Sequence, residues 1–116
     1  MRQLPARPNA EKWAAMSFNA QMANIGSEVG RTAKWISKEK YDLAEGAFIR
    51  ALDLFDLTIK YGRDGQENRS PMLRELCLCR CEFSKAYLDK DATNLSGVER
   101  YFSHFAKAYS KEHMES

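Results

Sequence analysis

The chain has 116 residues, of which 44% are hydrophobic and 29% are charged, and its formal net charge is +2. These values are typical of one small globular domain with a single modest core. So small a charge argues against DNA binding, and no stretch is long and apolar enough to predict a membrane span. The first residues also lack the apolar segment of a secretory signal, so we expect a cytoplasmic protein.

Residues 1–9 contain two prolines and little periodicity, which predicts a loose lead-in before a single helical-bundle domain at 10–116. Asn9 is a suitable N-cap for the first helix. From 10 to about 37 the chain has no proline and repeats apolar residues every three or four positions, as a helix requires. The main apolar row of this helix is Ala14, Phe18, Met22, Ile25, Val29, Ala33 and Ile36. A split near its two glycines would divide it into two helices.

Three further helices are predicted downstream. The second occupies 41–61 and is followed by a polar loop at 62–71 that holds two glycines and a proline. A serine followed by a proline then suits the start of a third helix, which reaches residue 88. A second loop is predicted at 89–97, and a fourth helix at about 98–112. The residues expected to face inward on the last two helices are Leu73, Leu76, Cys77, Phe83, Tyr87 and Leu88, then Val98, Tyr101, Phe102, Phe105, Ala108 and Tyr109.

The chain has no stretch of alternating β-branched residues that would predict a strand. We therefore predict an all-α fold, a four- or five-helix up-and-down antiparallel bundle. One internal pattern suggests an alternative. Ala44, Phe48 and Ala51 match part of a tetratricopeptide repeat, although the corresponding positions one repeat later do not.

Two glycines interrupt the predicted first helix. Gly26 and Gly30 lie on one helix face beside Ala23 and Ser27, and each lowers helix stability by about 1 kcal/mol relative to alanine. A strip of small residues lets another helix approach closely. Two interpretations remain open: tight packing within the chain, or a helix–helix seam between two copies.

Arg80 lies within the apolar row of the third helix. A guanidinium keeps its charge, so on a core face it must find an acidic partner or extend to solvent. We predict a buried ion pair with an acid from another helix, Asp53 or Asp56 first and Glu28 second. A ligand-binding arginine is the alternative interpretation.

The three cysteines lie within the stretch 77–81, so we expect reduced thiols that fill the core rather than a disulfide framework. Zinc sites use a second cysteine pair or histidines at suitable spacing, which this chain lacks, so neither a metal nor a cofactor is predicted.

Arg100 and His104 occupy one face of the predicted last helix. A small helical bundle with an arginine and a histidine in this position resembles the HEPN superfamily. That resemblance implies a helical bundle, often dimeric, which is either an RNase using an Arg-x4–6-His motif or an inactive partner of a nucleotidyltransferase. The spacing here is Arg-x3-His, and a tyrosine follows the arginine.

These observations favour a non-enzymatic helical interaction module or accessory subunit, HEPN-like and homodimeric, with a protein partner. The alternatives are a HEPN-like nuclease that acts on RNA through Arg100 and His104, and a tetratricopeptide-like scaffold. Neither DNA nor a membrane is an expected partner.

Overall fold

The computed structural model of the chain describes residues 10–61 and 69–115, and these form five α-helices. The lead-in at 1–9, with Asn9, and most of the predicted loop at 62–71 lie outside the described residues. The helices are α1 (Ala10–Ala15), α2 (Phe18–Ser37), α3 (Tyr41–Tyr61), α4 (Arg69–Leu88) and α5 (Ala92–Glu115).

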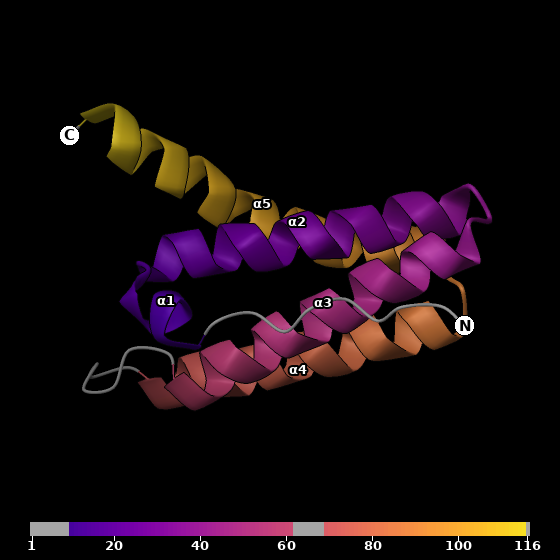
Figure 1. Cartoon of the computed structure of the whole chain (residues 1–116), viewed down its shortest axis with the longest axis horizontal. Helices are drawn as coiled ribbons and strands as arrows, with labels where there is room; N and C mark the ends of the chain where they lie inside the picture. The colour runs from indigo at the N-terminus through magenta and orange to yellow at the C-terminus, as the bar shows by residue number, and fades with distance from the viewer. Residues whose placement is uncertain (1–9, 62–68, 116) are drawn as a thin grey trace.

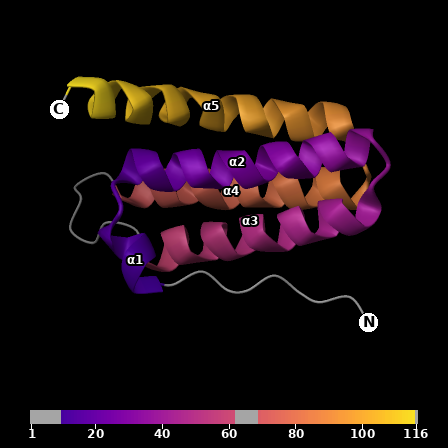
Figure 2. The same ribbon diagram turned by 45° about the horizontal axis from the view of Figure 1, so that its top comes forward.

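The four long helices form an antiparallel bundle in which each one reverses the direction of the last (Figures 1 and 2). Helix α2 packs against both α3 and α5, and α4 packs against both α3 and α5, so the helices close around one core. Helix α1 is a short addition that lies against α3. In Figure 1 the last turns of α5 lead away from the first turns of α2. The prediction of an all-α bundle is confirmed.

The break in the first helical segment lies at Met16–Ser17, and α2 runs without interruption through both glycines. Ser17 has extended backbone angles, φ −64° and ψ 157°, and its side chain accepts a hydrogen bond from the amide of Ala20 at 3.1 Å. This N-cap satisfies an amide that the start of a helix leaves without a partner. The helix is therefore not split near Gly26 and Gly30, the alternative left open by the sequence, and the additional helix arises from the serine cap upstream.

Helix α5 begins at Ala92, so the predicted loop at 89–97 is too long. Asp91 caps this helix, since its carboxylate accepts bonds from the backbone amide of Asn94 at 3.0 Å and from the side-chain amide of Asn94 at 2.8 Å. Leu95 is fully buried and anchors the first turn in the core. The polar residues of this segment suggested a loop, but the cap and the single buried leucine outweigh their low helix propensity.

The core consists mainly of the predicted apolar rows. Its fully buried aromatic residues are Phe55, Phe83 and Phe102. The Phe55 ring is tilted against Phe83, with centroids 5.8 Å apart, and meets Phe102 edge to face at 5.7 Å. Two residues assigned to the inner row of α4 are exposed instead: Cys77 and Leu88, the latter 74% exposed. They lie at the edges of the apolar arc, where helical periodicity alone does not decide which side faces the core.

Candidate functional site

The glycines of α2 lie beneath α5. A Cβ atom placed on Gly26 would lie 2.7 Å from Phe102 Cβ, and one placed on Gly30 would collide with the carboxylate of Glu99. The absence of a side chain at Gly26 therefore allows α5 to lie directly on α2. The close packing that this strip predicts occurs within the chain. Of its other members, Ala23 is half-buried and Ser27 is exposed.

An open groove runs between α2 and α5 beside this contact, with a volume of about 480 Å³. Its lining residues are Ser27, Gly30, Arg31, Ala33, Lys34, Ser37, Ser96 and Glu99. Pockets that enclose small molecules reach this volume, but they surround most of the ligand and are mainly apolar. This groove is open to solvent and carries charges of both signs, so it suits a segment lying on the surface.

Glu28 forms a buried ion-pair centre next to the groove. Its side chain is 12% exposed and accepts bonds from Arg31 Nη1 at 2.5 Å and from Arg50 Nε at 3.0 Å. Arg31 follows it by one turn of α2, whereas Arg50 comes from α3. One carboxylate therefore holds two guanidinium groups side by side across two helices. Charge-assisted bonds of this kind are stronger than those between neutral groups.

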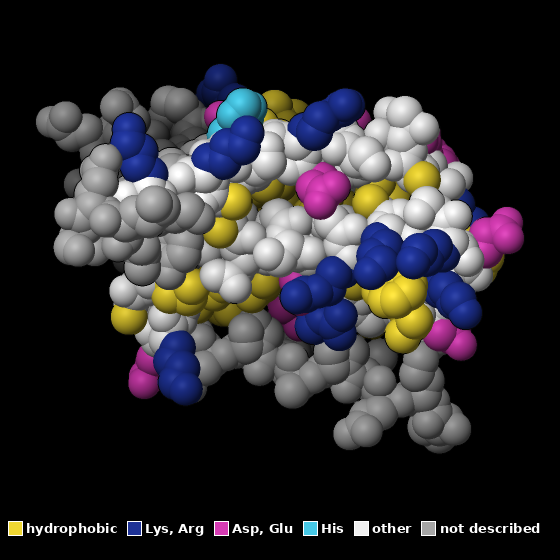
Figure 3. Space-filling view, turned by 90° about the horizontal axis from the view of Figure 1, so that it is seen from above, with side chains coloured by type: hydrophobic (Ala, Val, Ile, Leu, Met, Phe, Trp, Pro, Cys, Tyr) yellow, Lys and Arg dark blue, Asp and Glu magenta, His cyan; other side chains and the backbone are white. Residues whose placement is uncertain are grey.

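A basic cluster surrounds Trp35 near the end of α2. Lys34 Nζ lies 5.0 Å and Lys38 Nζ 5.9 Å from the centre of the half-buried indole ring. Arg31, Lys34 and Lys38 are all exposed. Figure 3 shows Lys and Arg side chains gathered around hydrophobic side chains on this side of the molecule. We call Arg31, Lys34, Trp35 and Lys38 the basic cluster.

Arg80 pairs with Asp56 of α3, and this pair is exposed. Arg80 Nε donates to Asp56 Oδ1 at 2.8 Å, and the two side chains are 36% and 58% exposed. Arg80 extends along the edge of α4 instead of entering the core, so the prediction of a buried pair is wrong. Its guanidinium bonds neither Asp53 nor Glu28. Glu28 is the buried acid among the residues proposed for this pair, and its partners are Arg31 and Arg50.

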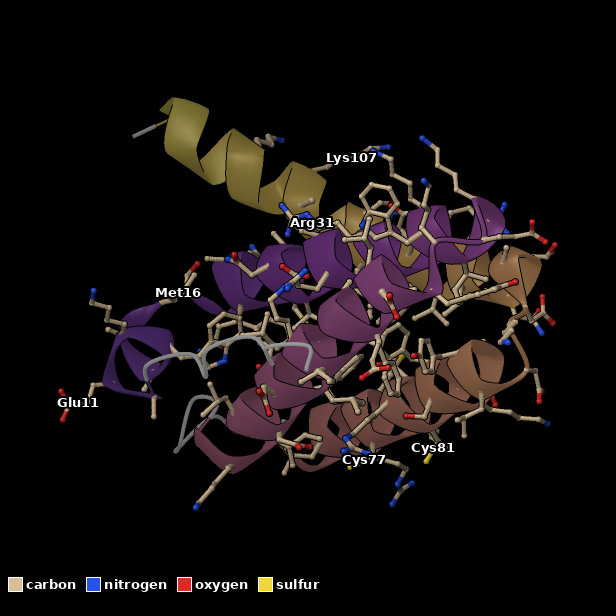
Figure 4. All side chains as sticks on the ribbon, turned by 45° about the vertical axis from the view of Figure 1, so that its right-hand side comes forward. Glu11, Met16, Arg31, Cys77, Cys81 and Lys107 are labelled. Carbon is tan, nitrogen blue, oxygen red and sulfur yellow. The ribbon has the colours of Figure 1, made fainter. Side chains whose placement is uncertain are left out.

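The cysteines do not fill the core as expected. Cys77 and Cys81 are exposed on the outer side of α4 (Figure 4), and only Cys79 turns partly inward. Burial raises the pKa of the Cys79 thiol to about 11, and the nearby carboxylates of Glu75 and Glu82 add to the shift. Cys79 therefore stays protonated near neutral pH and is a poor nucleophile.

Arg100 and His104 are both exposed and lie one turn apart on α5. The backbone carbonyl of Arg100 accepts a bond from Ser103 at 2.7 Å. Figure 4 marks Arg31 on α2 and Lys107 farther along α5, which are basic residues of the two helices that carry this face. The arrangement keeps Arg100 and His104 open to solvent on a helix that borders the groove.

Sequence reasoning missed Arg50, which completes the Glu28 centre. A basic residue at the middle of an amphipathic helix is an ordinary surface feature, so no signal in the sequence connects it to Glu28. Within 10–61 and 69–115, no cluster of three His, Cys, Asp or Glu side chains could hold a metal ion. No helix in this part of the chain has the length and apolar character needed to cross a membrane.

Comparison with models of known protein families found no match, and comparisons with curated proteins and with solved structures found none either.

Proposed function

We propose that this chain is a non-catalytic helical interaction module, an accessory subunit that binds a protein partner through the face formed by α2 and α5. The observation that carries the proposal is the open groove between these helices, bordered by the exposed basic side chains of α2. Gly30 and Ala33 also line the groove, and the carboxylate of Glu99 lies over Gly30. This role agrees with the non-catalytic members of the HEPN superfamily that the sequence resembles.

The position of the groove supports a rigid docking surface. The contact of Gly26 with Phe102 holds α2 and α5 together, and Glu28 ties α2 to α3 through Arg50. A preformed surface loses less conformational entropy on binding than a mobile one. The homodimer expected from the sequence is a second part of this proposal, and analytical ultracentrifugation measures it directly.

Site-specific photo-crosslinking tests the proposal in the cells that make the protein. A photo-reactive benzoylphenylalanine would replace Ser37 or Ser96, both exposed at the groove, and Lys85 on the outer side of α4 would serve as the control position. We expect a discrete adduct, identified by mass spectrometry as one partner protein, from the groove positions only. Adducts that are equally frequent from Lys85, or none at all, would contradict an interaction surface here.

The nuclease alternative has one observation in its favour, the exposure of Arg100 and His104 on one side of α5. Labelled single-stranded RNA incubated with the purified protein separates the two functions. An interaction module leaves the RNA intact. Cleavage that disappears in His104→Ala and Arg100→Ala, while both variants keep their helical circular dichroism, would replace the interaction module by the nuclease.

The tetratricopeptide alternative finds less support in the arrangement of the helices. Repeats of that type stack helix pairs into an open superhelix. Here α5 packs back against α2, and the long helices enclose one core. The partial repeat pattern at Ala44, Phe48 and Ala51 instead supplies two fully buried alanines and a half-buried aromatic ring to that core.

A further inference from the structure

We propose that the face of α2 and α5 binds an acidic polypeptide segment of its partner, an inference that rests on the proposed function. The basic cluster supplies the attraction. Arg31, Lys34 and Lys38 are exposed on α2, and Arg50 adds a partly exposed guanidinium from α3. Glu28 bonds Arg31 and Arg50, and Glu99 lines the groove beside Arg31 and Lys34, so these four basic groups exceed the two carboxylates.

The basic residues are arranged along α2 in a way that suits an acidic helix. Arg31, Lys34 and Lys38 follow each other at intervals of three and four residues, which places them along one side of the helix. A partner helix with carboxylates at the same intervals can meet them in register. Trp35 lies among them and offers an apolar ring to the stem of a bound side chain.

The charges in the groove favour a polypeptide over a nucleic acid. Glu99 lines the groove together with Arg31 and Lys34, and Ser27, Ser37 and Ser96 add hydroxyl groups. The backbone of a nucleic acid is negative at every phosphate and would bring like charge against Glu99. A polypeptide can place its carboxylates at the lysines and a neutral or basic side chain at Glu99, so it matches the mixed lining.

Lys34 and Lys38 also make the inference testable without disturbing the fold. Both side chains are exposed, and neither takes part in the Glu28 centre. The variant Lys34→Glu with Lys38→Glu therefore reverses the charge of the cluster while the bonds of Arg31 and Arg50 stay in place. The matched control is Arg74→Glu with Lys85→Glu, which makes the same charge change on exposed positions of α4.

The probe is a fluorescein-labelled helical peptide with glutamates at alternating three- and four-residue intervals and with alanine and glutamine elsewhere. A scrambled peptide of the same composition controls for net charge. Fluorescence anisotropy should show that the patterned peptide binds the wild-type chain more tightly than the scrambled one. The Lys34→Glu, Lys38→Glu variant should weaken binding by about tenfold or more, while the α4 control stays close to wild type. Amide chemical-shift changes should be confined to the residues that line the groove, the basic cluster and the neighbourhood of Arg50.

Each other outcome overturns the inference. An oligouridine RNA that binds through Lys34 and Lys38 more tightly than the peptide would identify a nucleic-acid site. A wild-type dimer that dissociates in the Lys34→Glu, Lys38→Glu variant would identify the face as a contact between two copies. If the patterned and scrambled peptides bind equally well, or if the peptide binds the variant and its α4 control equally well, net charge alone explains the binding. If groove crosslinks persist while the peptide does not bind, only the acidic class is wrong and the interaction module stands.

Discussion

At the scale of single residues, Glu28 and Asp56 accept similar bonds from arginines in very different surroundings. The Glu28 side chain is 12% exposed and bonds Arg31 of its own helix and Arg50 of α3. Asp56 is 58% exposed and meets Arg80 at the surface. Because solvent competes for exposed groups and ions screen them, an exposed pair contributes little to stability. Burial therefore decides which of the two carboxylates the fold depends on.

Replacing these two carboxylates by their amides tests the difference. We expect Glu28→Gln to lower the free energy of unfolding by about 1–3 kcal/mol, because charge-assisted bonds to two arginines are weakened in a protected place. Asp56→Asn should change it by less than about 1 kcal/mol. Urea unfolding followed by circular dichroism measures both values. Equal losses in the two variants would show that Glu28 is not the centre of a protected network.

At the scale of the elements, the spacing between α2 and α5 is set by one glycine. Gly26 has Phe102 directly above it, whereas a Cβ atom on Gly46 of α3 would meet only Arg50 Nη1 at 3.5 Å, an ordinary contact distance. Gly30 is intermediate, because the atom in the way is the end of the flexible Glu99 side chain. The three glycines thus cost the same helix propensity but differ in what an added methyl group would displace.

Alanine substitutions should separate these positions. Gly26→Ala gains about 1 kcal/mol of helix propensity but forces α5 away from α2, so we expect a net loss of about 1–2 kcal/mol. Gly46→Ala should gain about 0.5–1 kcal/mol, since the added group has room. Thermal and urea unfolding of the two variants provide the comparison. A stabilising Gly26→Ala would mean that the helices do not approach each other as closely as the contact with Phe102 requires.

Helices α2 and α4 are each followed by a residue that has left-handed backbone angles but is not glycine. Glu39 has φ 58°, and the amides of Glu39 and Lys40 return to the carbonyls of Ile36 and Trp35 at 3.0 and 2.8 Å. This is the Schellman arrangement, in which glycine is preferred because it lacks a Cβ atom. Glu39→Gly should therefore stabilise the fold by about 0.5–1 kcal/mol. Lys85→Gly inside α4 should instead cost about 1 kcal/mol, and the same unfolding measurement distinguishes the two.

At the scale of the whole molecule, stability depends on keeping the Cys79 thiol of α4 and the Tyr101 hydroxyl of α5 protonated. Burial raises the pKa of Cys79 from 9.0 to about 11, with Glu75 and Glu82 contributing. Burial also raises the pKa of Tyr101 on α5, which in addition donates a hydrogen bond to Glu75. Both groups are neutral in the folded chain at pH values where the unfolded chain has begun to lose their protons.

This difference predicts a loss of stability at alkaline pH. Below pH 9.0 the Cys79 thiol is protonated in both states, and its contribution is fully present. As pH rises towards about 11, only the unfolded chain releases the proton, so the free energy of unfolding should fall across this interval. Denaturant titrations at successive pH values measure the slope. Cys79→Ala should make that slope shallower, whereas Cys77→Ser, at an exposed position, should leave it unchanged.

The sequence by itself determined the helical class, the bounds of α3 and the buried row of α2 from Met22 to Ile36. These features depend on the three- and four-residue periodicity of apolar side chains, which is local information. The sequence also predicted Asp56 as one of the acids that could pair with Arg80. It could not place the start of α5, because one cap and one buried leucine decided against a run of loop-forming residues.

Only the tertiary structure decided what covers each face. Contacts between residues far apart in the chain decide three features. They place α5 on Gly26, join Arg50 to Glu28 and leave Arg80 exposed beside Asp56. The periodicity of the sequence shows which side of a helix carries apolar or small residues. It does not show which other helix packs against that side. The groove between α2 and α5 exists because these helices are brought together by packing, which local sequence patterns do not specify.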